Sequence, residues 1–83
     1  MVQLKVVAVS SNRNAFGLRN MILIGDNGEG WQAAANDLNV QPKDTILRIP
    51  EGQDIPTFLT LQSFEIPSQL ADPPAELLEE VWG

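Results

Sequence analysis

The positions of the apolar residues predict a protein built mainly of short β-strands. Residues 2–10 begin by alternating apolar and polar side chains and then become apolar at successive positions. This pattern is typical of a strand whose second half is buried on both faces. Turn-rich links of a few residues follow each apolar run, and no internal repeat is present. Further runs that predict strands cover residues 18–25, 45–49 and 57–66, and the last two end at Pro50 and Pro67.

The dipeptide Asn27-Gly28 predicts a tight β-hairpin after the second run. Both residues accept the positive φ that a type I′ turn requires. With these two residues at the centre of the turn, Ile24 should face Trp31 across the hairpin, and Ile22 should face Ala33. We expect Trp31 to be a core residue.

Residues 31–38 allow two interpretations. Their apolar side chains stand at i, i+3, i+4 and i+7, the spacing of a helix, and Pro42 follows where a helix would end. The preceding hairpin turn requires a returning strand instead, and a helix of about eight residues is marginally stable. We therefore expect a strand over residues 31–36, followed by a single turn.

The last residues, "ADPPAELLEEVWG", predict a short acidic helix. Asp72 is expected to cap this helix, whose first turn tolerates the two prolines that follow. The pairs Leu77/Val81 and Leu78/Trp82 are spaced i, i+4 and form an apolar side opposite two glutamates. So short a helix does not persist alone in water, so it either docks on its own domain or binds a partner. The residues predicted to contact a partner from this tail are Leu78, Glu79 and Trp82.

The predicted fold class is therefore mainly β: a small five-stranded barrel or two-sheet roll with an Asn-Gly hairpin and a short C-terminal helix. Eighty-three residues make one folded unit, with a β domain over residues 1–70 and the acidic amphipathic tail over residues 71–83. The composition is that of a globular protein, with 43% hydrophobic and 19% charged residues.

Charge is distributed unevenly along the chain. The formal net charge is -6, yet residues 1–24 contain Lys5, Arg13 and Arg19 and no acidic residue. The strong overall negative charge repels a polyanion, so nucleic acid is not expected as a general partner. The basic residues leave one local edge that suits an anionic or polar partner.

The chain contains no histidine, cysteine or tyrosine. The usual general base at neutral pH, the thiol nucleophile and the common soft metal ligands are therefore missing, and we expect neither an enzyme nor a cofactor or metal site. The segment "DNGEG" lacks the ligand spacing of a calcium loop. The stretch "VVAVSSNRNAFG" resembles the first strand and phosphate loop of flavodoxin-like reductases, but that loop opens a helix, whereas a strand is expected here.

The segment "SSNRNAFGLRN", residues 10–20, has two interpretations. In the first it is a connection between strands, with Gly17 in a conformation barred to other residues and Phe16 folded back onto the core. In the second, Arg13 and Arg19 form a contact edge together with the amides of neighbouring asparagines.

These observations favour a non-catalytic binding or regulatory module that contacts another protein of unknown identity. The alternatives are a nucleic-acid-contacting β-barrel that uses the basic loop 12–20, a structural subunit of a larger assembly, and an acidic nucleic-acid mimic. No apolar run approaches the roughly 18 residues of a membrane span, so no membrane contact and a cytoplasmic location are expected. The predicted contact residues are Arg13, Arg19, Leu78, Glu79 and Trp82.

Overall fold

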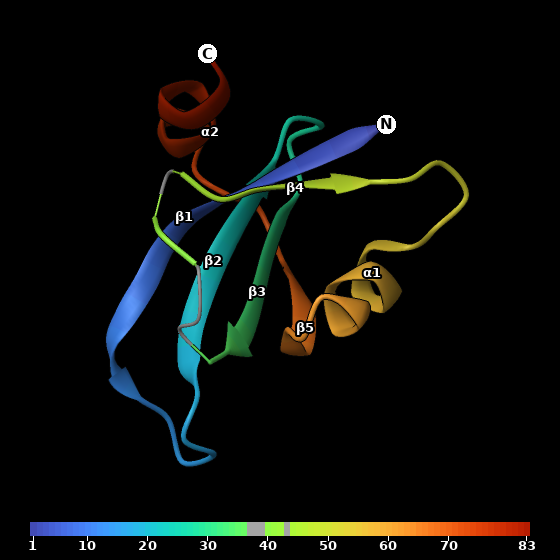
Figure 1. Cartoon of the computed structure of the whole chain (residues 1–83). Coiled ribbons are helices and arrows are strands. Elements are labelled where there is room, and N and C mark those ends of the chain that lie inside the picture. The colour runs from blue at the N-terminus through green and yellow to red at the C-terminus, as the bar shows by residue number, and fades with distance from the viewer. Residues whose placement is uncertain (37–39, 43) are drawn as a thin grey trace.

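The computed structural model describes residues 1–36, 40–42 and 44–83 and contains one antiparallel sheet with two short helices (Figure 1). The strands lie in the order β4-β1-β2-β3-β5. Each strand pairs antiparallel with its neighbour, and short hairpin connections join β1 to β2 and β2 to β3. The elements are β1 (Val2–Arg13), β2 (Arg19–Gly25), β3 (Gly30–Ala35), β4 (Ile46–Ile49), α1 (Ile55–Leu61), β5 (Glu65–Leu70) and α2 (Ala75–Trp82).

The sheet is open, which leaves the expected barrel or two-sheet roll unconfirmed while the mainly β class is confirmed. β4 and β5 form the two edges of a single five-stranded sheet. β5 carries Pro67 within the strand, where the missing N–H is tolerated because an edge strand pairs on one side only. Pro67 was expected to end a strand, and the structure places it inside one.

One face of the sheet, here called the core face, packs against α1 (Figure 1). Leu4, Val6 and Leu23 are fully buried on this face, and Leu59 of α1 is fully buried against them. Trp31 joins this core and is 8% exposed, as expected from the sequence. The opposite, outer face carries the alternate residues of the same strands, among them Lys5, Ile22, Ile24, Gln32 and Ala34.

The Asn-Gly hairpin forms where it was predicted, but its turn type and register differ. The amide of Gly28 donates to the carbonyl of Gly25, and the amide of Gly25 donates to the carbonyl of Glu29. Gly28 has φ +89°, whereas Asn27 is not among the residues with positive φ. This is a three-residue loop with a type I turn and a left-handed glycine, not a type I′ turn.

The extra loop residue shifts the pairing by one position. Trp31 lies opposite Leu23 and Ile24 lies opposite Gly30, so the expected Ile24–Trp31 and Ile22–Ala33 pairs are wrong. Because side chains alternate between faces, this slip moves Trp31 to the core face, the face of Leu23. The strand expected over residues 31–36 is confirmed as β3, with bounds shifted by one residue. The turn expected after it falls on residues outside the described part of the chain.

The strand expected over residues 57–66 is wrong, because the first half of this segment belongs to α1 and only its last two residues belong to a strand, β5. The Asp54 side chain accepts a hydrogen bond from the Thr57 amide at 3.3 Å and caps the helix, and Pro56 lies in its first turn. Ile55 and Leu59, spaced i, i+4, are the buried residues of the helix. The fifth strand, β5, therefore begins later than expected.

A short C-terminal helix, α2, forms as predicted, but it begins later than the sequence predicted. Its N-cap is Pro74 without a side-chain cap, so Asp72 is not the cap and both prolines precede the helix. Asp72 instead has φ +50° in the connection after β5. α2 lies at one end of the molecule beside β2 (Figure 1).

No helix in the described part of the chain is long and apolar enough to cross a membrane.

Candidate protein-contact site

The connection between β1 and β2 forms a tight hairpin at the end of the sheet opposite to α2 (Figure 1). The Asn14 amide donates to the Leu18 carbonyl at 2.7 Å, and the Gly17 amide donates to the Asn14 carbonyl at 3.0 Å. Gly17 has φ +77°, as the sequence predicted for this glycine. The pattern repeats that of the Gly25–Glu29 loop, so both hairpins use a type I turn followed by a left-handed glycine.

Polar side chains of this hairpin hold its own backbone. The side-chain oxygen of Asn14 accepts from the amides of Phe16 at 2.9 Å and Leu18 at 3.1 Å. The Asn14 side-chain amide also donates to the Asn20 side chain at 3.1 Å. The Ser10 hydroxyl accepts from the Asn20 amide at 3.0 Å. These bonds cross-link both strands with the loop and favour one loop conformation.

The two arginines predicted as contact residues lie opposite each other across the hairpin. Arg13 is exposed and donates from Nη1 to the Gly17 carbonyl at 2.8 Å. Arg19 is half-buried and donates to the carbonyls of Ser11 at 2.6 Å and Ser10 at 3.3 Å. Both guanidinium groups are therefore positioned by backbone oxygens of the hairpin, and this places two positive charges at its base.

Phe16 lies at the tip of this hairpin and is 74% exposed. The expectation that it folds back onto the core is wrong, because the turn from Asn14 to Gly17 places Phe16 at the tip of the hairpin, where its side chain is exposed. An exposed phenyl ring gains nothing from the hydrophobic core of its own domain. A loop held by several hydrogen bonds thus presents one large apolar side chain to the outside.

Sequence reasoning missed the exposure of Phe16. The signal that identifies it is the spacing from Asn14 to Gly17, which matches the spacing from Gly25 to Gly28 in the second hairpin. A polar residue three positions before a glycine between two strands favours a type I turn, in which the two central side chains point to solvent.

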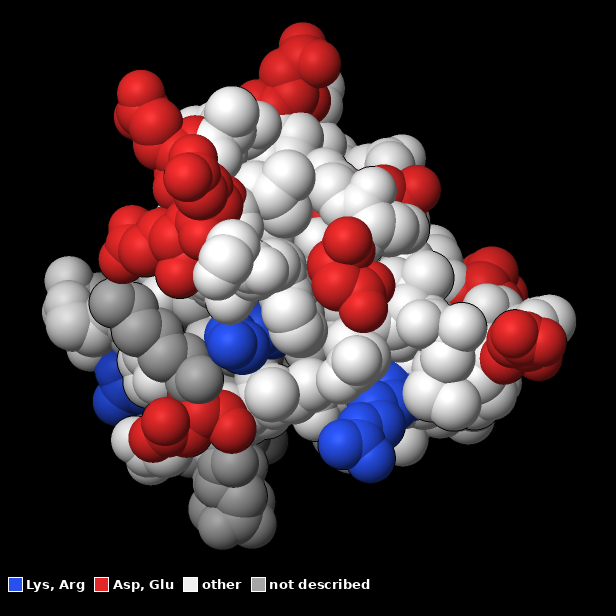
Figure 2. All heavy atoms as spheres, turned by 90° about the horizontal axis from the view of Figure 1, so that it is seen from above, with Lys and Arg blue, Asp and Glu red and all other residues white. Residues whose placement is uncertain are grey.

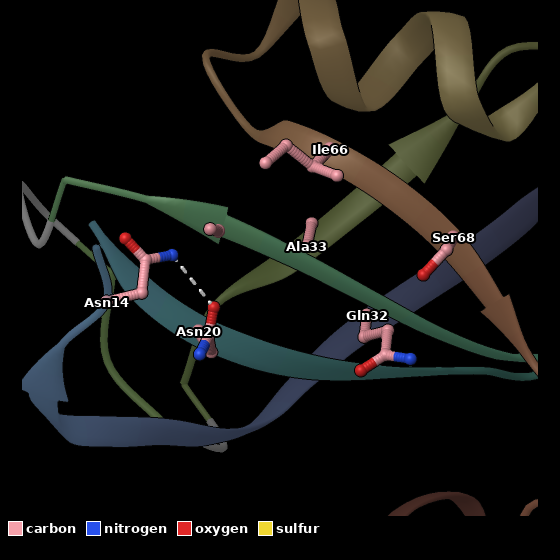
Figure 3. Close-up of a pocket in the computed structure, with 7 residues that line it drawn as sticks. Asn14, Asn20, Gln32, Ala33, Ile66 and Ser68 are labelled. Atoms are coloured by element: carbon pink, nitrogen blue, oxygen red, sulfur yellow. Dashed lines mark hydrogen bonds between the residues drawn. The ribbon is translucent and has the colours of Figure 1, made fainter. Parts of the chain in front are cut away.

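A trough lined by both polar and apolar side chains lies beside this hairpin on the outer face of the sheet (Figure 3). Its volume is about 270 Å³. Asn14 and Asn20 of the hairpin form one side, Ile66 and Ser68 of β5 form the other, and Gln32 lies between them (Figure 3). Side-chain amides and a hydroxyl can donate and accept hydrogen bonds, and an ionisable side chain is not part of the lining.

A bulge in β5 directs Ile66 toward this trough (Figure 3). The pairing of β3 and β5 shifts between Gln32 and Ala34, and Ile66 has φ +54° directly before Pro67. A β-branched residue rarely adopts this conformation, and a following proline favours extended backbone. Ile66 is nevertheless 62% exposed, so little burial offsets the strain.

The tail residues predicted to contact a partner lie at the other end of the molecule. Trp82 is half-buried and donates from Nε1 to the Ile24 carbonyl at 2.9 Å. Leu78 is half-buried beside Gly28, while Glu79 is exposed. The structure thus brings Arg13 and Arg19 together, brings Leu78 and Trp82 together on α2, and separates the two groups.

Acidic side chains surround the α2 end of the molecule. Figure 2 views the protein from above, toward this end, and shows carboxylate-bearing residues projecting at several points of the face. The exposed acidic residues in and before α2 are Asp72, Glu76, Glu79 and Glu80. The two ends therefore differ in charge, with the basic hairpin at one end and the acidic helix at the other.

No group of three or more histidine, cysteine, aspartate or glutamate side chains in the described part of the chain is placed to hold a metal ion. Among the described carboxylates, the Asp54 group has its pKa lowered, because Thr57 donates hydrogen bonds to its charged form. This carboxylate caps α1 and lies outside the hairpin, so its ionisation affects the stability of the fold rather than the candidate site.

Comparison with known proteins finds no matching family model, no matching curated protein and no matching solved structure. The function is therefore inferred from the geometry of this chain.

Proposed function

We propose that this protein is a non-catalytic binding module that contacts another protein through the tip of its β1–β2 hairpin. Phe16 is the anchor of the contact, and Arg13 and Arg19 supply positive charge at the base of the same hairpin. The observation that carries the proposal is the 74% exposure of Phe16 on a loop that its own polar side chains hold in place.

Aromatic residues and arginine are enriched in protein interfaces, where a few of them supply most of the binding energy. A loop that is already ordered loses little conformational entropy when it binds, so more of the contact energy appears as affinity. The hairpin combines these features, because Asn14 fixes the loop from which Phe16 projects.

The positive charge of the hairpin indicates what kind of partner surface it can bind. Residues 10–20 contain two arginines and no acidic residue. A partner with an apolar pocket bordered by carboxylates complements a hairpin with a phenyl ring at its tip and guanidinium groups at its base. The chain as a whole carries a net charge of -6, so an acidic partner is repelled by most of its surface. Binding of such a partner through the basic hairpin is therefore favoured.

The test is affinity capture from an extract of the source cells with three forms of the protein: wild type, Phe16→Ala and Leu61→Ala. Leu61 is 67% exposed on α1, so its variant removes a similar apolar surface at another place. We expect a protein that wild type and Leu61→Ala retain and that Phe16→Ala loses, with at least about a tenfold loss of affinity when remeasured with the purified partner.

Absence of any captured protein that depends on Phe16 would contradict the proposal. Nuclease treatment of the extract is included because an exposed aromatic ring beside arginines also suits single-stranded nucleic acid. Capture that disappears after nuclease treatment would favour this second function instead.

A further inference from the structure

The helix α2 docks on the outer face of the sheet through a small set of side-chain and backbone contacts. Its docking surface consists of Lys5, Ile24, Gly28 and Gly30. Lys5 donates from Nζ to the Val81 carbonyl at 3.2 Å and stands 4.7 Å from the centroid of the Trp82 ring. The Trp82 indole donates to the Ile24 carbonyl at 2.9 Å. One basic side chain thus binds the carbonyl end of an acidic helix and its aromatic side chain.

The contact extends to the residue that enters α2 from the connection. Gly30 is buried, and a Cβ placed on it would lie 3.2 Å from the Cβ and Cγ of Pro73. Pro73 therefore packs directly on the backbone of β3. The unit that docks on the outer face begins at Pro73 and ends at Trp82.

This unit is weakly integrated into its own domain. None of the residues of α2 is fully buried. An eight-residue helix does not persist in water without a surface to cover its apolar side. α2 is consequently stable as a helix only when its apolar side is docked on a surface such as that formed by Lys5, Ile24, Gly28 and Gly30. This surface can belong to the same chain or to a second copy.

The connection to the unit is strained in the conformation that brings α2 back onto its own sheet. Asp72 has φ +50° and directly precedes Pro73. A residue before proline favours extended backbone, and Asp72 adopts the left-handed region instead. The φ angle of Asp72 sets the direction in which the chain continues into Pro73, so an extended Asp72 would not leave α2 in its present position. The local preference of this residue therefore opposes the docking of α2 on its own sheet.

We propose that α2 exchanges between two copies of this chain, so that the unit from Pro73 to Trp82 of each copy docks on Lys5, Ile24, Gly28 and Gly30 of the other. Every contact of the closed form is made again by identical groups, while Asp72 relaxes to extended backbone. Such an exchange is a low-cost route to a dimer with two-fold symmetry. In the closed monomer, α2 docks on the sheet of its own chain and makes the same contacts. Dimer formation costs translational and rotational entropy in addition, so it depends on protein concentration.

The test compares Asp72→Gly with Asp72→Val by sedimentation equilibrium over a range of concentrations. Both variants remove the same charge, but glycine accepts a positive φ, whereas β-branched valine opposes it. We expect the dimer of Asp72→Val to be tighter than that of Asp72→Gly by roughly 100-fold, about tenfold for each of the two connections.

Two outcomes overturn the proposal. The first is an equal dimer affinity for the two variants. The second is an Asp72→Val monomer whose Trp82 fluorescence shows a solvent-exposed indole, because α2 has then detached without finding a second copy. The hairpin contact of the proposed function does not affect these results.

Discussion

The indole N–H of Trp82 donates a hydrogen bond to the backbone carbonyl of Ile24 at 2.9 Å, which joins the last residue of α2 to β2 across 58 positions of the chain. Ile24 is fully buried, so few other donors can reach its carbonyl. This directional contact thus helps to fix the amphipathic tail on an apolar strand.

Trp82→Phe should lower the free energy of unfolding by about 1–2 kcal/mol, because the phenyl ring keeps much of the apolar contact and the Ile24 carbonyl loses its donor. Urea denaturation measures the change. Glu79→Gln, at an exposed position of the same helix, is the control and should stay within about 0.5 kcal/mol of wild type. Equal stability of the two variants would show that the hydrogen bond contributes nothing.

Asn14→Ala should destabilise the protein by about 1–2 kcal/mol, since the Asn14 side chain bonds the Phe16 and Leu18 amides and the Asn20 side chain. Phe16→Ala should change stability by less than about 0.5 kcal/mol, because Phe16 is 74% exposed. Hydrogen exchange gives a second measurement. In Asn14→Ala the amides of Phe16 and Leu18 should lose protection, and unchanged protection would argue against the network.

Leu59→Ala should destabilise the protein by about 2–5 kcal/mol, whereas Leu61→Ala should have almost no effect. Leu59 is fully buried and Leu61 is 67% exposed. In a strand these two residues would share one face and their substitutions would cost similar amounts. The comparison, made by thermal unfolding, therefore distinguishes the observed helix α1 from the strand that the sequence pattern suggested.

The cap of α1 should make stability depend on pH in the acidic range. The pKa of Asp54 is lowered in the folded protein by hydrogen bonds from Thr57. Between the unfolded and the folded pKa values, the unfolded chain binds more protons than the folded one. The stabilisation is therefore complete above about pH 4 and is lost as the pH falls through the lower, folded value.

Asp54→Asn is the matched variant for this prediction, because asparagine also caps helices but does not titrate. The stability of wild type relative to Asp54→Asn should decrease as the pH is lowered from 6 to below 3, measured by thermal unfolding at each pH. Parallel curves for the two proteins would contradict the assignment of Asp54 as an ionised cap.

The strand prediction was most accurate where local signals and packing agree. β1 and β2 alternate or repeat apolar residues, and each ends at a turn with a left-handed glycine, Gly17 and Gly28. The segment that failed, residues 57–66, contains apolar residues in both the helical and the extended period. Asp54 and Pro56 marked a helix start there, but those residues were expected to lie in a loop.

The candidate site was predictable in part. The clustering of Arg13 and Arg19 on one hairpin follows from the two flanking strands and their short connection. The exposure of Phe16 did not follow, because an apolar residue in a loop can either cover the core or project from it. Which of these occurs depends on the turn geometry that Asn14 imposes.

The sequence by itself determined the mainly β class, the positions of both hairpins and the amphipathic character of the C-terminal helix. These features arise from the alternation of neighbouring side chains and from the conformational freedom of single glycines, which are local properties. Tertiary structure decided the one-residue shift that moves Trp31 to the core face, the helical state of residues 55–61 and the docking of Trp82 on Ile24. Each of these depends on contacts between distant segments, whose energies outweigh small local preferences only once the chain is folded.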